Sequence, residues 1–127
     1  MIVLDASVMI GYLDAGDLHH ERAEQLLDRA AQPLAISTVT LAEVLVGPTR
    51  AGQERWLGEI LSDLDVTEVL GPEGSAPALA RLRVDTGLRL PDCCVLLAAR
   101  SSGAAVATFD ARLAAAAASL GLLVLDG

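Results

Sequence analysis

The feature that most restricts the fold of this chain is the alternation of short apolar segments with longer segments of helical periodicity. The apolar segments predict five strands, at residues 2–4, 34–37, 66–70, 104–108 and 122–125. The segments between them predict helices at residues 6–13, 19–31, 38–47, 53–64, 76–87, 90–103 and 110–121. Gly47 and Pro48 are expected to end the third helix. We therefore predict an α/β fold with a central, mostly parallel five-stranded sheet flanked by helices on both faces.

The length and composition predict a single domain over residues 1–127, since 127 residues with 53% hydrophobic residues suffice for one core. The longest apolar run, at 113–125, is shorter than the roughly 20 residues that span a bilayer. No basic region precedes the apolar start, so a signal peptide is not expected. Cys93 and Cys94 are adjacent, which disfavours a disulfide, and we expect buried free thiols. These observations together predict a cytoplasmic domain with no membrane contact.

The charge of the chain argues against a simple nucleic-acid-binding protein. The net charge is −8, and all nine basic residues are arginines, with no lysine. Proteins that bind nucleic acids usually carry a basic surface. A role on nucleic acid would therefore require that bound cations or a basic protein partner offset the acidic residues.

Four acidic residues fall where a parallel sheet places its ligands, beyond the carboxyl ends of the strands. Asp5 directly follows the first strand, and Asp110 follows the fourth. Asp92 opens the helix that leads into the fourth strand, and Glu43 lies in the helix after the second. Carboxylates crowded together repel one another unless a cation binds. Oxygen ligands of this kind suit Mg²⁺ or Mn²⁺, and such a site hydrolyses phosphodiester bonds.

Each acidic residue also has a purely structural interpretation. Asp5 and Asp110 are suitable N-caps for the helices that follow them. Asp92 would complement the dipole of its helix. Glu43 shares a stripe with Thr40 and Gly47 that would face water. Only the combination of the four favours chemistry. Receiver domains and dehalogenase-like phosphatases also gather acidic residues at strand ends, but they need a lysine beside them, which this chain lacks.

Four segments carry a resemblance to a known family: "LDAS" at 4–7, "TLAEVLVG" at 40–47, "LPDCCVLLAA" at 90–99 and "VATFDARL" at 106–113. In their order and spacing the chain resembles PIN-domain ribonucleases, and in particular the VapC-type toxins of bacterial toxin–antitoxin pairs. The resemblance implies a PIN fold and a Mg²⁺- or Mn²⁺-dependent endoribonuclease in which a metal-activated water hydrolyses RNA. It also implies a homodimer and an antitoxin whose basic tail enters the acidic site.

The resemblance assigns roles to particular residues. It makes Asp5, Glu43, Asp92 and Asp110 the catalytic metal ligands. Ser7 and Thr108 would hydrogen-bond to the carboxylates or to a bound water and orient them. The alternative is a PIN-like module that binds or regulates without catalysis. Four uncompensated acidic residues argue against that alternative, because a non-catalytic protein has no physical reason to keep them together.

Several other residues carry weaker expectations. Phe109 stands where the family often has a small or polar residue, so it either packs or shapes the substrate channel. His19 and His20 predict a solvated turn, and Trp56 is expected to face inward. Arg81, Arg83 and Arg89 are expected to pair on the surface with Asp85, or else to contact RNA phosphates.

Overall fold

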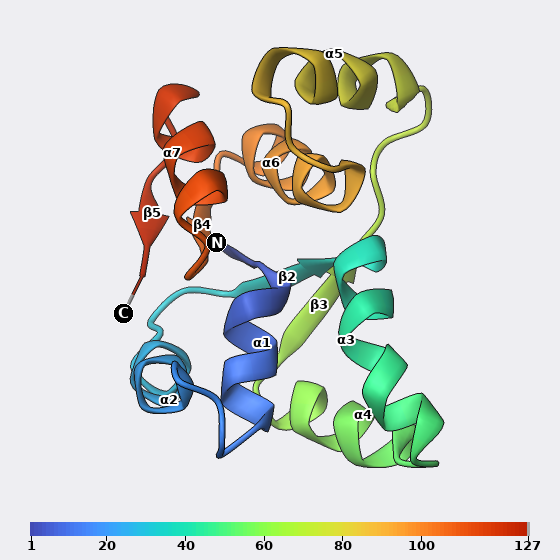
Figure 1. The fold of residues 1–127 in the computed structure, drawn as a ribbon, viewed down its shortest axis with the longest axis vertical. Helices are drawn as coiled ribbons and strands as arrows, with labels where there is room; N and C mark the ends of the chain where they lie inside the picture. Colours follow the sequence, from blue (N-terminus) through green and yellow to red (C-terminus); the bar gives the residue numbers. More distant parts are fainter. Residues whose placement is uncertain (127) are drawn as a thin grey trace.

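Five strands lie side by side in one sheet in the order β3-β2-β1-β4-β5, as the computed structural model of the chain shows for residues 1–126 (Figure 1). Every strand pairing among these residues is parallel. The strands are β1 (Ile2–Leu4), β2 (Leu34–Ser37), β3 (Val66–Val69), β4 (Ala105–Ala107) and β5 (Val124–Leu125). The predicted α/β fold is confirmed, and each strand lies within or equals the range predicted for it.

The helices occur in the predicted order. They are α1 (Ala6–Leu13), α2 (His20–Asp28), α3 (Thr38–Arg50), α4 (Glu54–Asp63), α5 (Ala76–Thr86), α6 (Leu90–Ser102) and α7 (Ala111–Ser119). The expected end of α3 at Gly47 and Pro48 is wrong, because the helix continues through both residues to Arg50. The carbonyl group of Pro48 accepts hydrogen bonds from the N–H groups of Ala51 and Gln53, at 3.2 and 2.8 Å. Proline removes one donor from the helix, but it leaves this acceptor available to close the last turn.

The sheet has a hydrophobic core on each face. Helices α5, α6 and α7 cover one face, where Val3 of β1 lies in the core. Helices α1 to α4 cover the other face, where Ile2 and Leu4 lie in the core (Figure 1). This alternation follows from the period of two in a strand. The prediction that Trp56 faces inward is wrong, since its side chain is 42% exposed, whereas the neighbouring Leu57 is fully buried.

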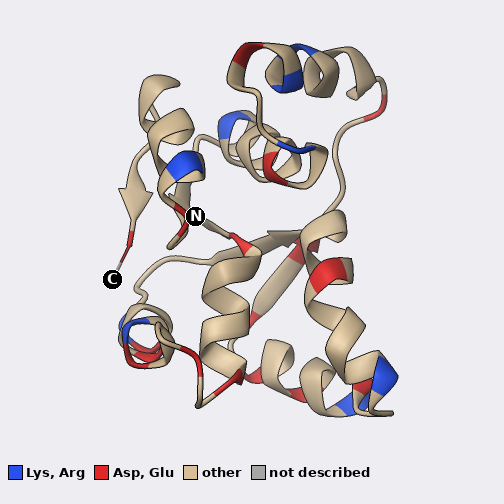
Figure 2. Cartoon of the chain, in the orientation of Figure 1, with Lys and Arg blue, Asp and Glu red and all other residues tan. Residues whose placement is uncertain are grey.

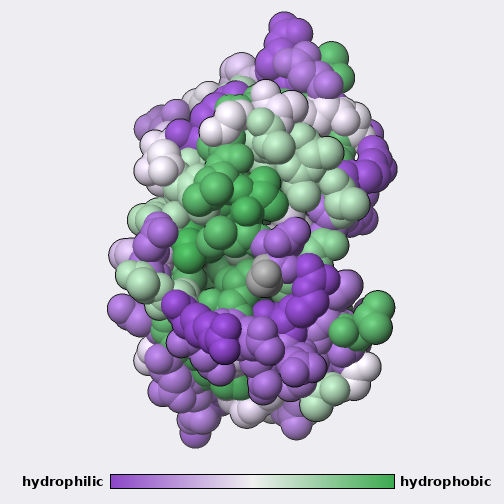
Figure 3. Space-filling model, turned by 90° about the vertical axis from the view of Figure 1, so that its left-hand side faces the viewer, coloured by the Kyte–Doolittle hydropathy of each residue, from purple (hydrophilic) through white to green (hydrophobic). Residues whose placement is uncertain are grey.

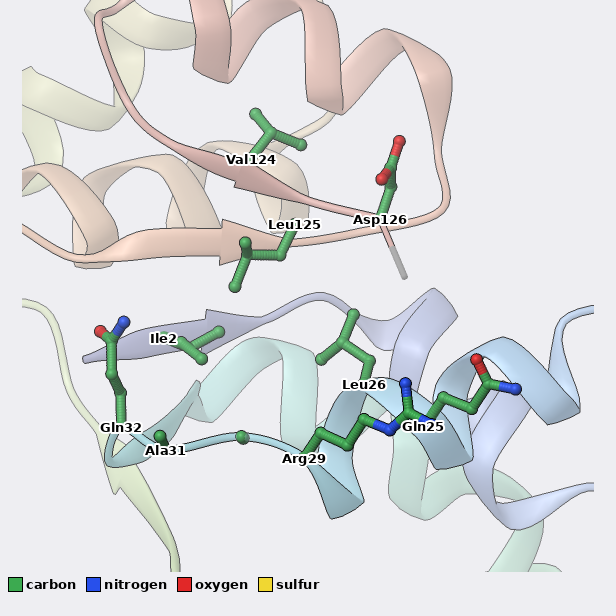
Figure 4. Close-up of a pocket in the computed structure, with 10 residues that line it drawn as sticks. Ile2, Gln25, Leu26, Arg29, Ala31, Gln32, Val124, Leu125 and Asp126 are labelled. Atoms are coloured by element: carbon green, nitrogen blue, oxygen red, sulfur yellow. The ribbon is translucent and has the colours of Figure 1, made fainter.

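The surface beside β5 is partly apolar. In the view of Figure 3, hydrophobic side chains gather on the side of the molecule formed by α7 and β5, and Leu123 is 64% exposed. A pocket of about 380 Å³ lies between the end of α2 and strands β1 and β5, lined by residues that include Ile2, Arg29 and Val124 (Figure 4). None of the predicted site residues lines this pocket. Within residues 1–126, every helix is too short or too polar to cross a bilayer.

The order of the strands brings together two of the segments that carry predicted site residues. β1 is the central strand, and Leu4 is in register with Ala107 of β4. The N–H group of Asp5 donates a hydrogen bond to the carbonyl group of Ala107, at 2.9 Å. The first residues after these two strands, Asp5 and Thr108, therefore leave the same edge of the sheet side by side.

Candidate active site at the carboxyl edge of the sheet

Asp5 is held by hydroxyl groups and does not cap a helix. It occupies the N-cap position of α1, but its side chain makes no capping hydrogen bond in the described part of the chain. Instead its Oδ2 accepts hydrogen bonds from Ser7 Oγ at 2.7 Å and from Thr108 Oγ1 at 2.8 Å. Asp5 is only 7% exposed. Its Oδ1 accepts no hydrogen bond from residues 1–126 and is not sealed from solvent, so this oxygen is available to a ligand.

The turn after β4 fixes the direction of both hydroxyl groups. The N–H group of Phe109 donates to Ser7 Oγ at 3.0 Å, and the N–H group of Asp110 donates to Thr108 Oγ1 at 3.0 Å. A hydroxyl group that accepts from an N–H group keeps its own hydrogen for donation. Ser7 and Thr108 therefore both present their hydrogens to Asp5 Oδ2.

Asp110 does cap a helix, as one of its two interpretations predicted. Its Oδ1 accepts hydrogen bonds from the N–H groups of Arg112 and Leu113 at the start of α7, at 2.8 and 3.1 Å. Its Oδ2 accepts no hydrogen bond within residues 1–126. Capping therefore uses one oxygen of the exposed Asp110 side chain and leaves the other free.

Asp92 and Glu43 lie close enough to the other acidic residues for those charges to change their pKa values. Partial burial raises the pKa of the Asp92 carboxyl, and the charges of Asp5 and Asp110 raise it further. Partial burial also raises the pKa of Glu43; the guanidinium of Arg89 opposes that rise, while Asp5 and Asp92 add to it. Figure 2 shows acidic positions from separate elements gathered around the start of α1. We call Asp5, Glu43, Asp92 and Asp110 the acidic centre.

Two arginines, Arg89 and Arg112, lie beside the acidic centre and were not among the predicted site residues. Arg89 acts on both Glu43 and Asp92, and Arg112 acts on Asp92; each lowers the pKa that it affects. Neither forms an ion pair within residues 1–126. A signal for Arg89 was present in the sequence, because it precedes Asp92 by three residues at a helix start. Arg81, by contrast, pairs with Asp85 at 3.9 Å on the surface, as expected.

The donor chemistry of the acidic centre fits a hard divalent cation. Mg²⁺ and Mn²⁺ prefer oxygen ligands, and the four side chains offer carboxylate oxygens only. However, no three His, Cys, Asp or Glu side chains among residues 1–126 are arranged so that they could hold a metal ion. The acidic centre therefore has ligands of a suitable type, but its side chains are not arranged to coordinate one ion together.

A Thr108→Val variant tests how far the hydroxyl groups hold Asp5. Thr108 is fully buried, and valine keeps its shape while removing one donor to Asp5 and the acceptor for the Asp110 N–H group. We expect the free energy of unfolding to fall by about 1–3 kcal/mol. The RNA cleavage that the family resemblance implies should fall by about 10- to 100-fold. Denaturant titration and cleavage assays measure the two effects. Thr67→Val, at an exposed position of β3, is the matched control and should change neither.

A Glu43→Gln variant tests the repulsion within the acidic centre. A carboxyl whose pKa is raised by folding adds stability below its unfolded pKa and loses that contribution as the pH rises through its folded pKa. Charged Glu43 therefore destabilises the metal-free protein at pH 7, although its exposure to water limits the effect. We expect Glu43→Gln to raise the melting temperature at pH 7 by about 1–2 °C and to have no effect near pH 4. Glu59→Gln, an exposed acidic residue of α4, is the control. An equal rise at both pH values would contradict the repulsion.

Comparisons with known proteins agree with this arrangement. The PIN domain family model matches residues 2–119. A chain of a toxin–antitoxin complex from Klebsiella pneumoniae is 26% identical, with 87% of each chain covered and a TM-score of 0.73. VapC20 of Mycobacterium tuberculosis, a toxin that cleaves the sarcin–ricin loop, is 20% identical, with 91% of this chain and 95% of that chain covered and a TM-score of 0.76.

A further solved structure is similar over nearly the whole chain. FitAcB from Neisseria gonorrhoeae is 22% identical, with 99% of this chain and 97% of that chain covered and a TM-score of 0.73. At these identities, the likeness to VapC20 and FitAcB shows a shared fold. No curated protein sequence matches the chain significantly.

Proposed function

The chain belongs to the PIN domain family, and we propose that it is a Mg²⁺- or Mn²⁺-dependent endoribonuclease, the toxin of a VapBC-type toxin–antitoxin pair. Its structural neighbours are toxins of such pairs, and one of them is a toxin that cleaves RNA. We further propose that residues 1–127 form a single PIN domain. The rest of the proposal depends on what the residues of the acidic centre can do.

The observation that carries this proposal is the burial and hydrogen bonding of the Asp5 carboxylate. A buried carboxylate at the end of the central strand has one oxygen bound by two hydroxyl groups and the other left free. Such hydrogen bonds hold a metal-binding carboxylate in one orientation before the metal ion binds to it. Charges from Glu43, Asp92 and Asp110 surround it. A residue that served only to start α1 would have no need of these neighbours.

The roles of the residues follow from this geometry. A divalent cation bound at the acidic centre would offset phosphate charge and make a water molecule a stronger nucleophile. Asp5, Glu43, Asp92 and Asp110 would hold the cation, and Ser7 and Thr108 would keep Asp5 in position. Arg89 and Arg112 lie beside the carboxylates without ion-pair partners in residues 1–126, and they can contact phosphate oxygens of the RNA.

The non-catalytic alternative is less well supported. Asp92 and Glu43 both have raised pKa values, in part because neighbouring carboxylates repel their charged forms. This repulsion reduces stability at neutral pH unless a cation is bound. A module that acted only by binding could replace these residues with neutral ones and become more stable, so the unrelieved charge favours catalysis.

The proposed protein partners have surfaces to bind. A groove of about 350 Å³ opens between α1, α3 and α4, and it is lined by Asp14, Glu43 and the exposed Trp56. A basic antitoxin tail with apolar side chains would complement this groove and reach the acidic centre, and the net charge of −8 would speed the encounter. For the homodimer, exposed Val39 and Leu70 border an apolar hollow of about 240 Å³ beside β3.

The ends of the cleaved RNA test the proposed reaction. When water attacks the phosphorus atom and the bond to O3′ breaks, the products carry a 5′ phosphate and a 3′ hydroxyl group. Attack by the RNA's own 2′ hydroxyl group instead leaves a 2′,3′-cyclic phosphate. We expect 5′-phosphate ends when purified protein is incubated with RNA and Mn²⁺. Cyclic phosphate ends, or no cleavage with either Mg²⁺ or Mn²⁺, would contradict the proposal.

A further inference from the structure

A cluster of three planar side chains stands beside the acidic centre. The ring of Phe109, in the turn after β4, stacks on the imidazole of His19, with ring centroids 4.9 Å apart and planes inclined by 30°. The guanidinium carbon of Arg22 lies 4.7 Å from the Phe109 ring centroid. We propose that His19, Arg22 and Phe109 form a nucleotide-binding ledge, which stacks on a base and contacts the backbone of the RNA strand next to the cleaved bond. This inference rests on the proposed nuclease function.

A hydrogen bond links two members of the ledge. Arg22 Nη1 lies 3.2 Å from His19 Nδ1. Arginine has donors only, so His19 Nδ1 is the acceptor of this bond. The predicted solvated turn at His19 and His20 is replaced by specific contacts, since His20 Nδ1 also lies 2.8 Å from the carbonyl oxygen of Gly11.

The ledge is connected to the acidic centre through two hydrogen bonds. The N–H group of Phe109 donates to Ser7 Oγ at 3.0 Å, and Ser7 Oγ donates to Asp5 Oδ2 at 2.7 Å. Phe109 also lies between Thr108 and Asp110 in the chain. A nucleotide bound at the ledge would consequently have its phosphate near Asp5 and Asp110.

The charge of Arg22 is not neutralised by the rest of the described chain. The molecule carries 17 acidic residues, yet Arg22 forms no ion pair with any carboxylate among residues 1–126. Its hydrogen bonds go to His19 Nδ1 and the carbonyl oxygen of Asp126, and to no carboxylate oxygen of the described residues. Arg22 is exposed, and Phe109 and His19 are half-buried, so the cluster reaches solvent. Proteins bind single-stranded RNA with positively charged groups and with aromatic or guanidinium planes on which bases stack, and the ledge supplies both.

A purely structural role explains less of the geometry. The bond from Arg22 to Asp126 ties α2 to the residue after β5, and Phe109 packs with the core below α1. Neither contact requires His19 to stack on Phe109 and the Arg22 guanidinium to lie over the same ring at the surface beside an acidic centre. The two accounts differ in what they predict for RNA binding, and this difference can be measured.

Binding of fluorescent single-stranded RNA octamers, one for each base, tests the ledge. Ca²⁺ replaces Mg²⁺ during binding so that cleavage is suppressed. Phe109→Leu removes the aromatic face but keeps an apolar side chain, and Arg22→Lys keeps the charge but removes the planar group. We expect each variant to bind about 5- to 20-fold more weakly than the unmodified protein. Arg100→Ala is the matched control, because Arg100 lies in the last turn of α6, at the opposite end of that helix from Asp92.

Cleavage kinetics with Mn²⁺ separate binding from positioning. The ledge predicts that KM rises in Phe109→Leu and Arg22→Lys while kcat stays within about twofold, since the contacts hold RNA in ground and transition states alike. A fall in kcat with unchanged RNA binding would overturn the inference, because Phe109 would then act only by holding Ser7. RNA cleavage by the unmodified protein with equal binding by all variants would overturn the ledge alone. Failure of the unmodified protein both to bind and to cut RNA would overturn the nuclease function with it.

Discussion

An Asp5→Asn variant should lose RNA cleavage by at least about 100-fold while keeping its fold. The asparagine oxygen can accept the same hydrogen bonds from Ser7 and Thr108, and no capping bond is lost because Asp5 makes none in the described chain. The change therefore replaces the free carboxylate oxygen with an amide nitrogen and removes one negative charge. Loss of groups that only support metal ligands costs about 10- to 100-fold, so loss of a ligand itself should cost more.

Cleavage of one RNA substrate under identical metal and salt conditions measures this effect. Asp85→Asn is the matched control, since Asp85 is exposed on α5 and contacts only Arg81 among its possible ion-pair partners in residues 1–126. Melting curves of the three proteins should nearly coincide. If Asp5→Asn cleaves RNA as fast as the unmodified protein, the acidic centre is not the active site, and the cleavage comes from another site or a contaminant.

Removing divalent metal should weaken RNA binding as well as abolish cleavage. At a net charge of −8, with four carboxylates at the proposed active site, RNA phosphates would meet uncompensated negative charge. We expect a chelator to weaken binding of a single-stranded RNA by more than about tenfold, and added Mg²⁺ or Mn²⁺ to restore it. Fluorescence anisotropy measures the affinity. Chelator that is already saturated with Mg²⁺ is the control, because it shows whether the added chelator itself changes RNA binding.

Metal-dependent RNA binding should also depend on pH and should be weaker at low pH. The pKa values of Asp92 and Glu43 are raised, and a carboxyl must lose its proton to bind a cation. Metal-dependent RNA binding should therefore weaken as the pH falls toward these pKa values, starting above the range of ordinary carboxyl groups. RNA affinity that does not change with chelator would show that the protein neutralises phosphate with its arginines alone.

The sequence predicted the strands well because each is a short apolar segment bounded by polar or glycine-containing turns. It did not distinguish the roles of Asp5 and Asp110, which both precede a helix and are equally suitable as caps. In the structure Asp110 caps α7, whereas Asp5 does not cap α1. The difference arises because Thr108 offers a hydroxyl group to Asp5 across 103 positions of sequence. Helix-capping preferences depend on residues nearby in the sequence, so they do not predict a contact between residues this far apart.

The same limit applies to the surface around the acidic centre. With so few aromatic residues, no sequence pattern connects Phe109 with His19 and Arg22, which lie in a different part of the chain. Trp56 was expected to face inward together with Leu57, yet a helix places adjacent residues about 100° apart, and of these two only Leu57 is buried. The separation of the four carboxylates also could not be predicted, because it depends on how the folded chain places side chains from four different helices and their N-caps.

The pairing of β1 with β4 has a consequence for the time at which this protein can become active. Asp5 precedes Thr108 by 103 residues in the chain, so Thr108, Phe109 and Asp110, which complete its surroundings, are synthesised long after it. A nascent chain on the ribosome therefore lacks the ordered surroundings of the Asp5 carboxylate until the segment through Asp110 has been translated. If the proposed function is correct, translation that stops early yields a fragment that cannot damage RNA, whatever the supply of antitoxin at that moment.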